Sequence, residues 1–89
     1  MDTWNVYMVR CSDDSLYTGI AMDVMRRVVE HNTNDVLAAK YTHARRPVTL
    51  VYQEKYDTRS AASKREYEIK RMDKKEKLML IMALPFEPR

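Results

Sequence analysis

The chain of 89 residues contains a single glycine, Gly19, so only one position is free of the limits that a side chain sets on the backbone. Glycine is used where another group must approach the backbone closely, or where a strand end needs unusual dihedral angles. Gly19 closes the segment Leu16-Tyr17-Thr18-Gly19 and precedes a predicted helix that carries Arg27 and His31. An open backbone beside an arginine suggests a site for a phosphate group.

The first two strands are predicted from β-forming segments at residues 4–11 and 16–20. The Ser-Asp-Asp-Ser segment at residues 12–15 supplies turn chemistry between them, so we expect a β-hairpin. Tyr7 and Tyr17 lie ten residues apart, on the two arms of this hairpin. Antiparallel pairing would bring them to neighbouring positions, where two phenols can share one face of the sheet.

A helix is predicted after the hairpin, with Asp23 as its N-cap. Its apolar residues are expected to form one inward-facing stripe, made of Val24, Met25, Val28 and Val29. Arg27 and His31 would lie together on one border of that stripe. Residues 32–47 show no clear period, and a short helical turn at residues 36–41 is the only element expected there.

The second half of the chain predicts one strand and two helices. The strand covers residues 48–56, and Asp57 or Thr58 can cap a helix that runs to about Met72. Asp73 and Glu76 resemble a capping box for a last helix at residues 74–84. The expected fold is therefore α+β, with the order ββαβαα and a single domain that covers residues 1–89.

Composition excludes several classes of protein. Apolar residues make up 45% and charged residues 33%, as in an ordinary globular domain. The lone cysteine, Cys11, excludes an internal disulfide and a zinc site built on cysteines. No segment reaches the roughly 18 consecutive apolar residues that span a bilayer, and no signal sequence is evident at the N-terminus. We therefore expect an intracellular protein, cytoplasmic or nuclear and not secreted.

The predicted last helix is apolar nearly all the way round, through Leu78, Met79, Leu80, Ile81, Met82 and Leu84. A domain of this size can seldom bury every face of a helix. Two interpretations remain open: a central core helix, or an interface for a second copy of the chain or another partner.

The predicted helix before it places Glu66 and Glu68 at opposite edges of its apolar stripe, within a run of bases that includes Lys64, Arg65, Lys70 and Arg71. A carboxylate amid positive charge suits a hard cation such as Mg²⁺, with water and phosphate oxygens completing its shell. An ordinary amphipathic helix with alternating charge also fits. A second basic cluster, formed by Lys40, Arg45 and Arg46, could contact a nucleic-acid backbone, and the net charge of +3 permits an acidic partner.

These residues occur in an order that resembles the GIY-YIG nuclease superfamily: Val6-Tyr7-Met8, Tyr17-Thr18-Gly19, Arg27 with His31, and then Glu66. The segments Arg45-Arg46-Pro47-Val48 and Leu50-Val51-Tyr52 are similar to the small single-domain members of its UPF0213 group. The resemblance implies a three-stranded antiparallel sheet flanked by helices. It also implies an endonuclease of low sequence specificity that depends on Mg²⁺ or Mn²⁺, with DNA as the expected substrate and DNA repair or recombination as its setting.

The resemblance also implies a role for each site residue. Tyr7 would help to deprotonate the attacking water, or act as the general base if a neighbour lowers its pKa, and Tyr17 would orient the water or the phosphate. Gly19 would let the backbone approach the phosphate. Arg27 would stabilise charge on the pentacoordinate phosphorus, and Glu66 would anchor one metal ion. His31 would relay a proton, hold Tyr7, or act as a rival base with a pKa of about 6.5.

Nucleic-acid contacts are expected from basic residues on both clusters: Lys40, Arg45, Arg46, Lys64, Arg65, Lys70 and Arg71. Two other functions remain open from the sequence. One is a nucleic-acid-binding module that has kept the fold without catalysis. The other is a protein-interaction subunit that works through its apolar last helix.

Overall fold

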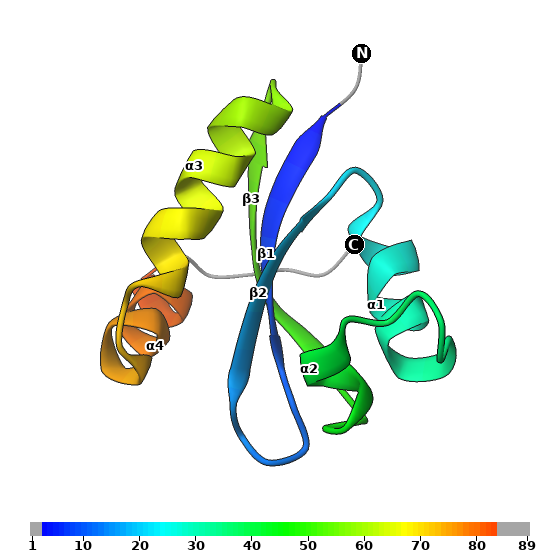
Figure 1. Cartoon of the computed structure of the whole chain (residues 1–89). Helices are drawn as coiled ribbons and strands as arrows, with labels where there is room; N and C mark the ends of the chain where they lie inside the picture. The colour runs from blue at the N-terminus through cyan, green and yellow to red at the C-terminus, as the bar shows by residue number, and fades with distance from the viewer. Residues whose placement is uncertain (1–2, 84–89) are drawn as a thin grey trace.

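The predicted hairpin forms the centre of the fold in the computed structural model, which describes residues 3–83. Strand β1 (Trp4–Arg10) pairs with β2 (Leu16–Ala21), and Asp13 stabilises the turn by accepting a hydrogen bond from the backbone N–H of Ser15 at 3.1 Å. Strand β3 (Thr49–Tyr56) adds to the other side of β1. The sheet is antiparallel throughout, with the order β2-β1-β3, so β2 and β3 are its edges (Figure 1).

The register of the hairpin places both tyrosines on one face. Tyr7 lies opposite Gly19, and Val9 lies opposite Tyr17. Because side chains alternate between the two faces of a strand, Tyr7 and Tyr17 point to the same side of the sheet, on neighbouring diagonal positions. The predicted sharing of one face is therefore confirmed.

Local capping signals fix where the helices begin. Helix α1 (Val24–Thr33) starts at Asp23, whose carboxylate accepts from the backbone N–H of Arg26. Helix α3 (Arg59–Lys70) starts at Thr58, which of the two predicted caps is the one used. Helix α4 (Lys74–Ala83) starts after a reciprocal capping box, in which Asp73 and Glu76 each accept from the other's backbone N–H.

The order ββαβαα is confirmed, with one short addition between α1 and β3. Helix α2 (Lys40–His43) forms a single turn at the end of the loop, a few residues after the turn expected at residues 36–41. The loop that follows contains a cis peptide bond between Arg46 and Pro47.

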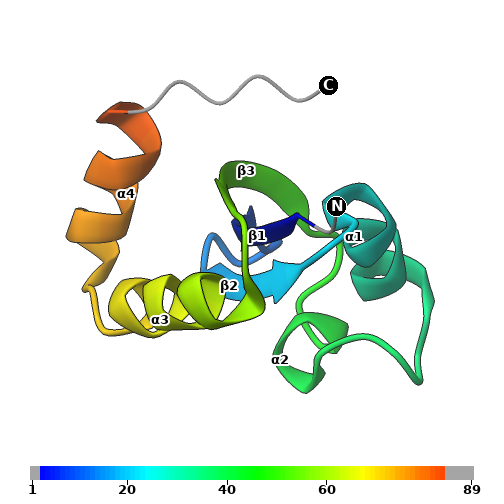
Figure 2. The same ribbon diagram turned by 90° about the horizontal axis from the view of Figure 1, so that it is seen from above.

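Helices cover both faces of the sheet (Figures 1 and 2). Helix α3 packs on the face that carries Val6 and Met8, and forms one core with Tyr52 through Ala62 and Ile69. The opposite face carries Tyr7 and Val9 and faces α1 and α2; its core consists of Tyr7, Val9, Cys11, Val24 and Val48. The predicted three-stranded sheet flanked by helices is therefore confirmed.

The buried face of α1 differs from the predicted stripe. Met25 and Val29 are 54% and 57% exposed, whereas the side chain of His31 is fully buried. The inward-facing positions are Val24, Val28 and His31, at the spacing i, i+4 and i+7. The prediction that Met25 and Val29 face inward is wrong, because a polar side chain with buried partners takes the core position instead.

The last helix, α4, is not a central core helix, so that interpretation is wrong. None of its described residues is buried: Leu80 and Ile81 pack against the edge of one core, while Met79 and Met82 are 61% and 82% exposed. Leu84, the end of the predicted apolar surface, lies outside the described residues. Within residues 3–83, no helix is long and apolar enough to span a bilayer.

Candidate active site

Gly19 makes room for the phenol of Tyr7. A Cβ placed on Gly19 would lie 2.7 Å from the Tyr7 hydroxyl oxygen and 2.8 Å from its Cζ, distances that no real side chain tolerates. Gly19 has no positive φ, so the close approach, and not an unusual dihedral angle, explains this glycine. Tyr7 therefore extends from the central strand across the edge strand β2. The group that approaches the Gly19 backbone here is the phenol itself.

The hydroxyl of Tyr7 lies 2.7 Å from Nε2 of His31, and both side chains are buried. On the other side of the imidazole, Nδ1 lies 2.8 Å from Oγ1 of Thr42, a fully buried residue of α2. His31 therefore contacts Tyr7 and Thr42 through its two ring nitrogens. Sequence reasoning assigned no role to Thr42, because the position of a threonine in a loop does not show that it is buried against His31.

Burial keeps both members of the Tyr7–His31 pair neutral at pH 7. Burial raises the pKa of Tyr7 well above its ordinary value, Tyr17 adds to this rise, and nearby Arg27 opposes it. Burial also lowers the pKa of His31 to about 4, and the positive charge of Arg27 acts in the same direction. The expectation of an ordinary His31 pKa is therefore wrong. Both ring nitrogens of His31 face protein groups, Tyr7 on one side and Thr42 on the other.

Tyr17 and Arg27 flank this pair. The Tyr17 ring meets the His31 ring edge to face, with centroids 5.4 Å apart. The Arg27 guanidinium is oriented by its Nη1, which donates to the Leu37 carbonyl at 2.6 Å and to the Glu30 carboxylate at 3.0 Å. The Arg27 side chain is 27% exposed, so its fixed positive charge lies beside Tyr7 and remains accessible to solvent.

Glu66 approaches the site from α3, across the β2 edge of the sheet. Its carboxylate forms an ion pair with Lys70 at 3.3 Å, and the Lys70 ammonium lies 5.9 Å from the centre of the Tyr17 ring. Its negative charge also contributes to the raised pKa of Tyr7. Glu68 points elsewhere and pairs with Arg65 at 3.3 Å. Helix periodicity left both carboxylates open; in the structure the charge of Glu66 acts on Tyr7, whereas Glu68 pairs with Arg65.

A divalent cation at this site would have one protein carboxylate. In residues 3–83, no three side chains of His, Cys, Asp or Glu gather in a way that could enclose a metal ion. Mg²⁺ is commonly bound by one or two carboxylates together with water and substrate phosphate oxygens. Glu66, half-buried beside Lys70, fits that open kind of site.

Three of the predicted nucleic-acid-binding arginines are engaged in the fold. Arg45 lies over the Tyr41 ring, 3.9 Å from its centre, and pairs with Asp13 at 3.2 Å. Arg46 donates from Nε to the His31 carbonyl at 2.6 Å and pairs with Asp35.

Arg65 is held on the side of the sheet away from Tyr7. It donates to the Glu54 carboxylate at 3.0 Å, and that carboxylate also accepts from the hydroxyls of Tyr52 and Tyr56. Lys70, by contrast, lies on the side of the tyrosines, with its ammonium 5.9 Å from the centre of the Tyr17 ring. Lys64 is exposed on α3, and Arg71 stacks on the Tyr67 ring at its C-terminal end.

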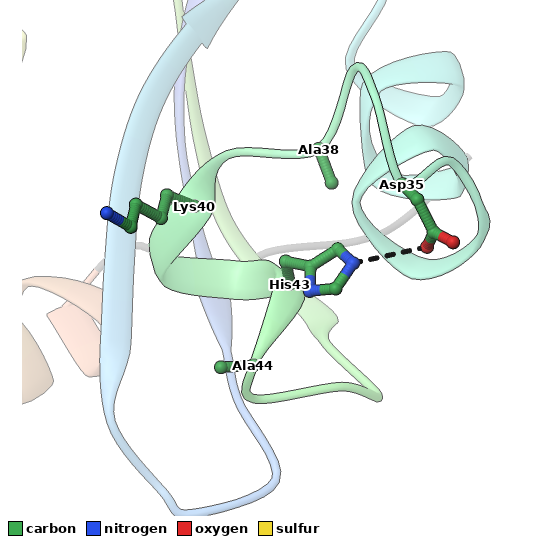
Figure 3. A pocket seen from close by; sticks show the side chains of 5 residues that line it. All are labelled: Asp35, Ala38, Lys40, His43 and Ala44. Atoms are coloured by element: carbon green, nitrogen blue, oxygen red, sulfur yellow. Dashed lines mark ion pairs between the residues drawn. The ribbon is translucent and has the colours of Figure 1, made fainter.

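Lys40 borders an open pocket of about 420 Å³ beside α2, shown in Figure 3. Nε2 of His43 lies 3.2 Å from Oδ1 of Asp35 within it, and the small residues Ala38 and Ala44 complete its lining. The Lys40 side chain extends away from Asp35 and His43 (Figure 3). Neither Tyr7 nor His31 lines this pocket.

Known relatives match nearly the whole chain. The profile of the GIY-YIG catalytic domain matches residues 3–79. A UPF0213 protein of Staphylococcus saprophyticus is 54% identical over 81 residues, which cover 91% of this chain and 96% of that protein. A UPF0213 protein of Staphylococcus aureus is 59% identical over the same shares of the two chains.

Two solution NMR structures are also similar. The UPF0213 protein of Bacillus halodurans superposes with a TM-score of 0.58 at 34% identity, covering 91% of this chain and 84% of that one. A protein of E. faecalis superposes with a TM-score of 0.60 at 33% identity, covering 100% and 95%. Sequence profile, relatives and fold agree, and the chain belongs to the GIY-YIG family, within its UPF0213 group.

Proposed function

We propose that this protein is a metal-dependent endonuclease that hydrolyses phosphodiester bonds in DNA with low sequence specificity. The observation that carries the proposal is the buried hydrogen bond of 2.7 Å between Tyr7 and His31, which lies beside Arg27 and Glu66. Burying polar groups such as Tyr7 and His31 costs stability unless they are paired, as they are here. Titratable groups from β1, α1 and α3 that gather in one place and have perturbed pKa values are typical of a catalytic site.

Tyr7 is the group that meets the attacking water. Its hydroxyl accepts a proton from water while its own proton moves to Nε2 of His31, so no free phenolate is required. The neutral state of His31 at pH 7 follows from its lowered pKa of about 4, and a neutral imidazole can accept that proton. The water oxygen forms a bond to phosphorus, and the bond from phosphorus to the leaving oxygen breaks.

Arg27 stabilises the charge that gathers on the phosphoryl oxygens as the bond to water forms. A guanidinium is permanently charged and offers several N–H donors in a fixed plane. Its contacts with the Leu37 carbonyl and Glu30 hold it in place before the reaction, so little reorganisation is needed. Removing one such stabilising group from an enzyme typically lowers kcat by about 10²- to 10³-fold.

Glu66 is the residue that would hold a divalent cation. When bound, Mg²⁺ or Mn²⁺ would polarise a phosphate oxygen and stabilise the leaving oxygen. Glu66 and Lys70 form an ion pair beside Tyr17, so an approaching phosphate meets a positive charge next to this carboxylate. Tyr17, packed on the His31 ring, borders the place where the phosphate would lie.

DNA is the partner that fits the charge of the site. Lys70 and Arg27 flank the tyrosines with positive charge, and exposed Lys64 extends that charge along α3. Phosphate contacts of this kind position a nucleic acid without reading its sequence. DNA binding through them should weaken steeply with salt, because each neutralised phosphate releases counterions.

A cleavage assay with neighbouring arginines tests the proposal. Purified protein is incubated with labelled single-stranded and branched DNA, with and without Mg²⁺ or Mn²⁺, beside Arg27→Ala and Arg26→Ala. Arg26 is the matched control, because it lies next to Arg27 on α1 but its side chain is 75% exposed. We expect metal-dependent cleavage by the wild type and Arg26→Ala, and its loss in Arg27→Ala.

Two outcomes would contradict the proposal in different ways. Binding without cleavage by the wild type would favour a nucleic-acid-binding module that lacks catalysis. Cleavage that survives undiminished in Arg27→Ala would show that the reacting phosphate lies elsewhere on the protein.

A further inference from the structure

Thr42 lies at the end of a chain of buried polar contacts that leads to Tyr7. Its side chain is fully buried on α2, and Oγ1 lies 2.8 Å from His31 Nδ1 and 2.9 Å from the Ala39 carbonyl oxygen. The same imidazole meets the Tyr7 hydroxyl through Nε2 at 2.7 Å. One continuous path therefore runs from the Ala39 carbonyl through Thr42 and His31 to Tyr7.

The Thr42 hydroxyl has one proton and two lone pairs, so it can donate only one hydrogen bond, and this decides which group donates at each contact of the path. A carbonyl oxygen can only accept, so the contact with Ala39 is a hydrogen bond only when Thr42 donates its proton there. The hydroxyl then offers a lone pair to His31, and the contact at 2.8 Å requires a proton on Nδ1. Both short contacts are satisfied together in this arrangement alone.

A third contact opposes this arrangement, but it is the longest of the three. The backbone N–H of Ala39 points toward His31 Nδ1 at 3.4 Å, which would favour an unprotonated Nδ1. Ordinary N–H hydrogen bonds have donor–acceptor distances of about 2.7–3.2 Å, so this contact is weak. The opposite tautomer would keep the 2.8 Å contact, with Thr42 as the donor to Nδ1, but would give up the 2.9 Å hydrogen bond to the Ala39 carbonyl oxygen. That bond of normal length contributes more than the stretched contact at 3.4 Å, so the tautomer protonated at Nδ1 is favoured.

We propose that Thr42 is a positioning residue that holds His31 in the tautomer protonated at Nδ1, so that the lone pair of Nε2 faces the Tyr7 hydroxyl. In the relay, water gives a proton to the Tyr7 oxygen, and Tyr7 gives its own proton to Nε2. The imidazolium that forms keeps its Nδ1 proton, which donates a hydrogen bond to Thr42 Oγ1. The opposite tautomer would present an N–H to Tyr7 and block this transfer. The catalytic consequence rests on the proposed function, whereas the tautomer itself does not.

The local structure suits Thr42 to this task. A β-branched side chain has few χ1 states, so a buried threonine holds its hydroxyl in a fixed direction. Helix α2 is only one turn long, and its N-cap residue Ala39 has an extended backbone and no side-chain cap. The single turn of α2 places the Ala39 carbonyl three residues before Thr42, within 2.9 Å of its hydroxyl, and so holds Thr42 against His31.

Nitrogen NMR of the His31 imidazole reads the tautomer directly, without a substrate. The wild type is compared with Thr42→Val, which keeps the shape but has no acceptor, and with Thr42→Ser, which keeps the hydroxyl. Far-UV circular dichroism and a urea unfolding curve confirm that each variant is folded. We expect the Nδ1-protonated form in the wild type and in Thr42→Ser, and its loss in Thr42→Val.

Steady-state cleavage then tests the catalytic consequence. Removing the hydrogen-bond partner of a metal-ligating histidine typically lowers activity by about 10- to 100-fold, and we expect a similar effect on a histidine that relays a proton. We expect Thr42→Val to lower kcat by that factor with KM unchanged, and Thr42→Ser to restore most of kcat. A purely structural role would not produce a kcat effect that follows the tautomer.

The outcomes separate this inference from the proposed function. A wild-type imidazole protonated at Nε2, or an unchanged tautomer in Thr42→Val, would overturn the role of Thr42 even if the enzyme cleaves DNA. A wild type that cleaves no DNA but shows the predicted tautomer would contradict the proposed function and leave the Thr42 assignment supported.

Discussion

Replacing Gly19 with alanine tests why the chain has its glycine at this position. The added Cβ would lie 2.7 Å from the Tyr7 hydroxyl oxygen and 2.8 Å from Cζ, where nonbonded carbon atoms normally stay about 3.5–4.0 Å apart. The Tyr7 ring would therefore have to move by about 0.7 Å or more. Tyr7 is only 1% exposed, so the ring has no free space to enter.

The expected cost has two sources. Forcing extra atoms into a packed core costs about 1–3 kcal/mol. Moving the phenol also breaks its 2.7 Å hydrogen bond to His31, and leaving buried groups unpaired costs about 1–3 kcal/mol more. We therefore expect Gly19→Ala to lower the free energy of unfolding by about 2–6 kcal/mol.

The sign of the effect makes this prediction sharp. Where the backbone conformation is allowed, Gly→Ala usually stabilises a protein by about 0.4–1 kcal/mol, because the unfolded chain loses freedom. Gly19 has no positive φ, so without the clash this gain would be observed. Urea unfolding followed by circular dichroism measures the difference.

A double-mutant cycle supplies the control for Gly19→Ala. In a Tyr7→Ala background the ring is gone, so the added methyl group should cost nothing and should even regain the small entropic benefit. A Gly19→Ala protein that is as stable as the wild type, or more stable, would refute the packing argument. So would an equal penalty in the Tyr7→Ala background.

Four further predictions follow from other contacts in the site and in the fold. The pKa of His31 is about 4 in the folded protein and about 6.5 in the unfolded chain, so below pH 6.5 the unfolded chain binds a proton that the folded protein does not. The contribution of His31 to the free energy of unfolding, about 3 kcal/mol, is therefore complete above pH 6.5 and is lost as the pH falls to 4. The stability difference between the wild type and His31→Gln, measured by urea unfolding, should shrink over that pH interval; a constant difference would contradict the buried neutral imidazole. Tyr7→Phe should lower kcat by about 10²- to 10⁴-fold in the DNA cleavage assay, and wild-type activity would exclude Tyr7 from proton transfer. Arg65→Met should destabilise the fold by about 1–3 kcal/mol, because it removes a hydrogen-bond partner of the Glu54 carboxylate, yet leave DNA affinity unchanged. Lys70→Met should weaken DNA binding and reduce its salt dependence, with little effect on stability. Fluorescence anisotropy at several salt concentrations measures the affinity and its salt dependence. A Lys70→Met protein that loses stability but binds DNA as tightly as the wild type would show that the DNA does not contact Lys70.

Elements with local signals were predictable from the sequence. The hairpin follows from two β-forming segments around a polar turn, and the starts of α1, α3 and α4 follow from caps at Asp23, Thr58 and Asp73. These signals act within a few residues, so no knowledge of tertiary contacts is needed. The pairing of Tyr7 and Tyr17 on one face was also predictable, because alternation in a strand fixes it.

The packing of the helices was less predictable, because polar residues take core positions. In α1, His31 is buried against Tyr7 and Thr42, while Met25 and Val29 stay exposed. A search for apolar periodicity assigns the core to the wrong side of such a helix. His31 can occupy a core position because Tyr7 on β1 and Thr42 on α2 pair with its ring nitrogens, and the local sequence of α1 does not show these partners.

The site itself was predictable in its residue types but not in its contacts. The choice between Glu66 and Glu68 depends on how α3 is rotated against the β2 edge, and helix periodicity does not determine that rotation. The role of Thr42 depends on a contact across eleven residues, between α1 and a helix of one turn. Only the folded chain brings these groups together.

The metal dependence of cleavage by two carboxylate variants tests the central claim most directly. Single-turnover cleavage of labelled DNA is measured over a range of Mg²⁺ concentrations for the wild type, Glu66→Gln and Glu68→Gln. Glu68 is the matched control, because it lies on the same helix but pairs with Arg65 away from the tyrosines. We expect saturable, Mg²⁺-dependent cleavage by the wild type and Glu68→Gln, and no cleavage above background by Glu66→Gln. Wild-type cleavage that needs no divalent metal, or a Glu66→Gln protein with wild-type activity, would contradict the account.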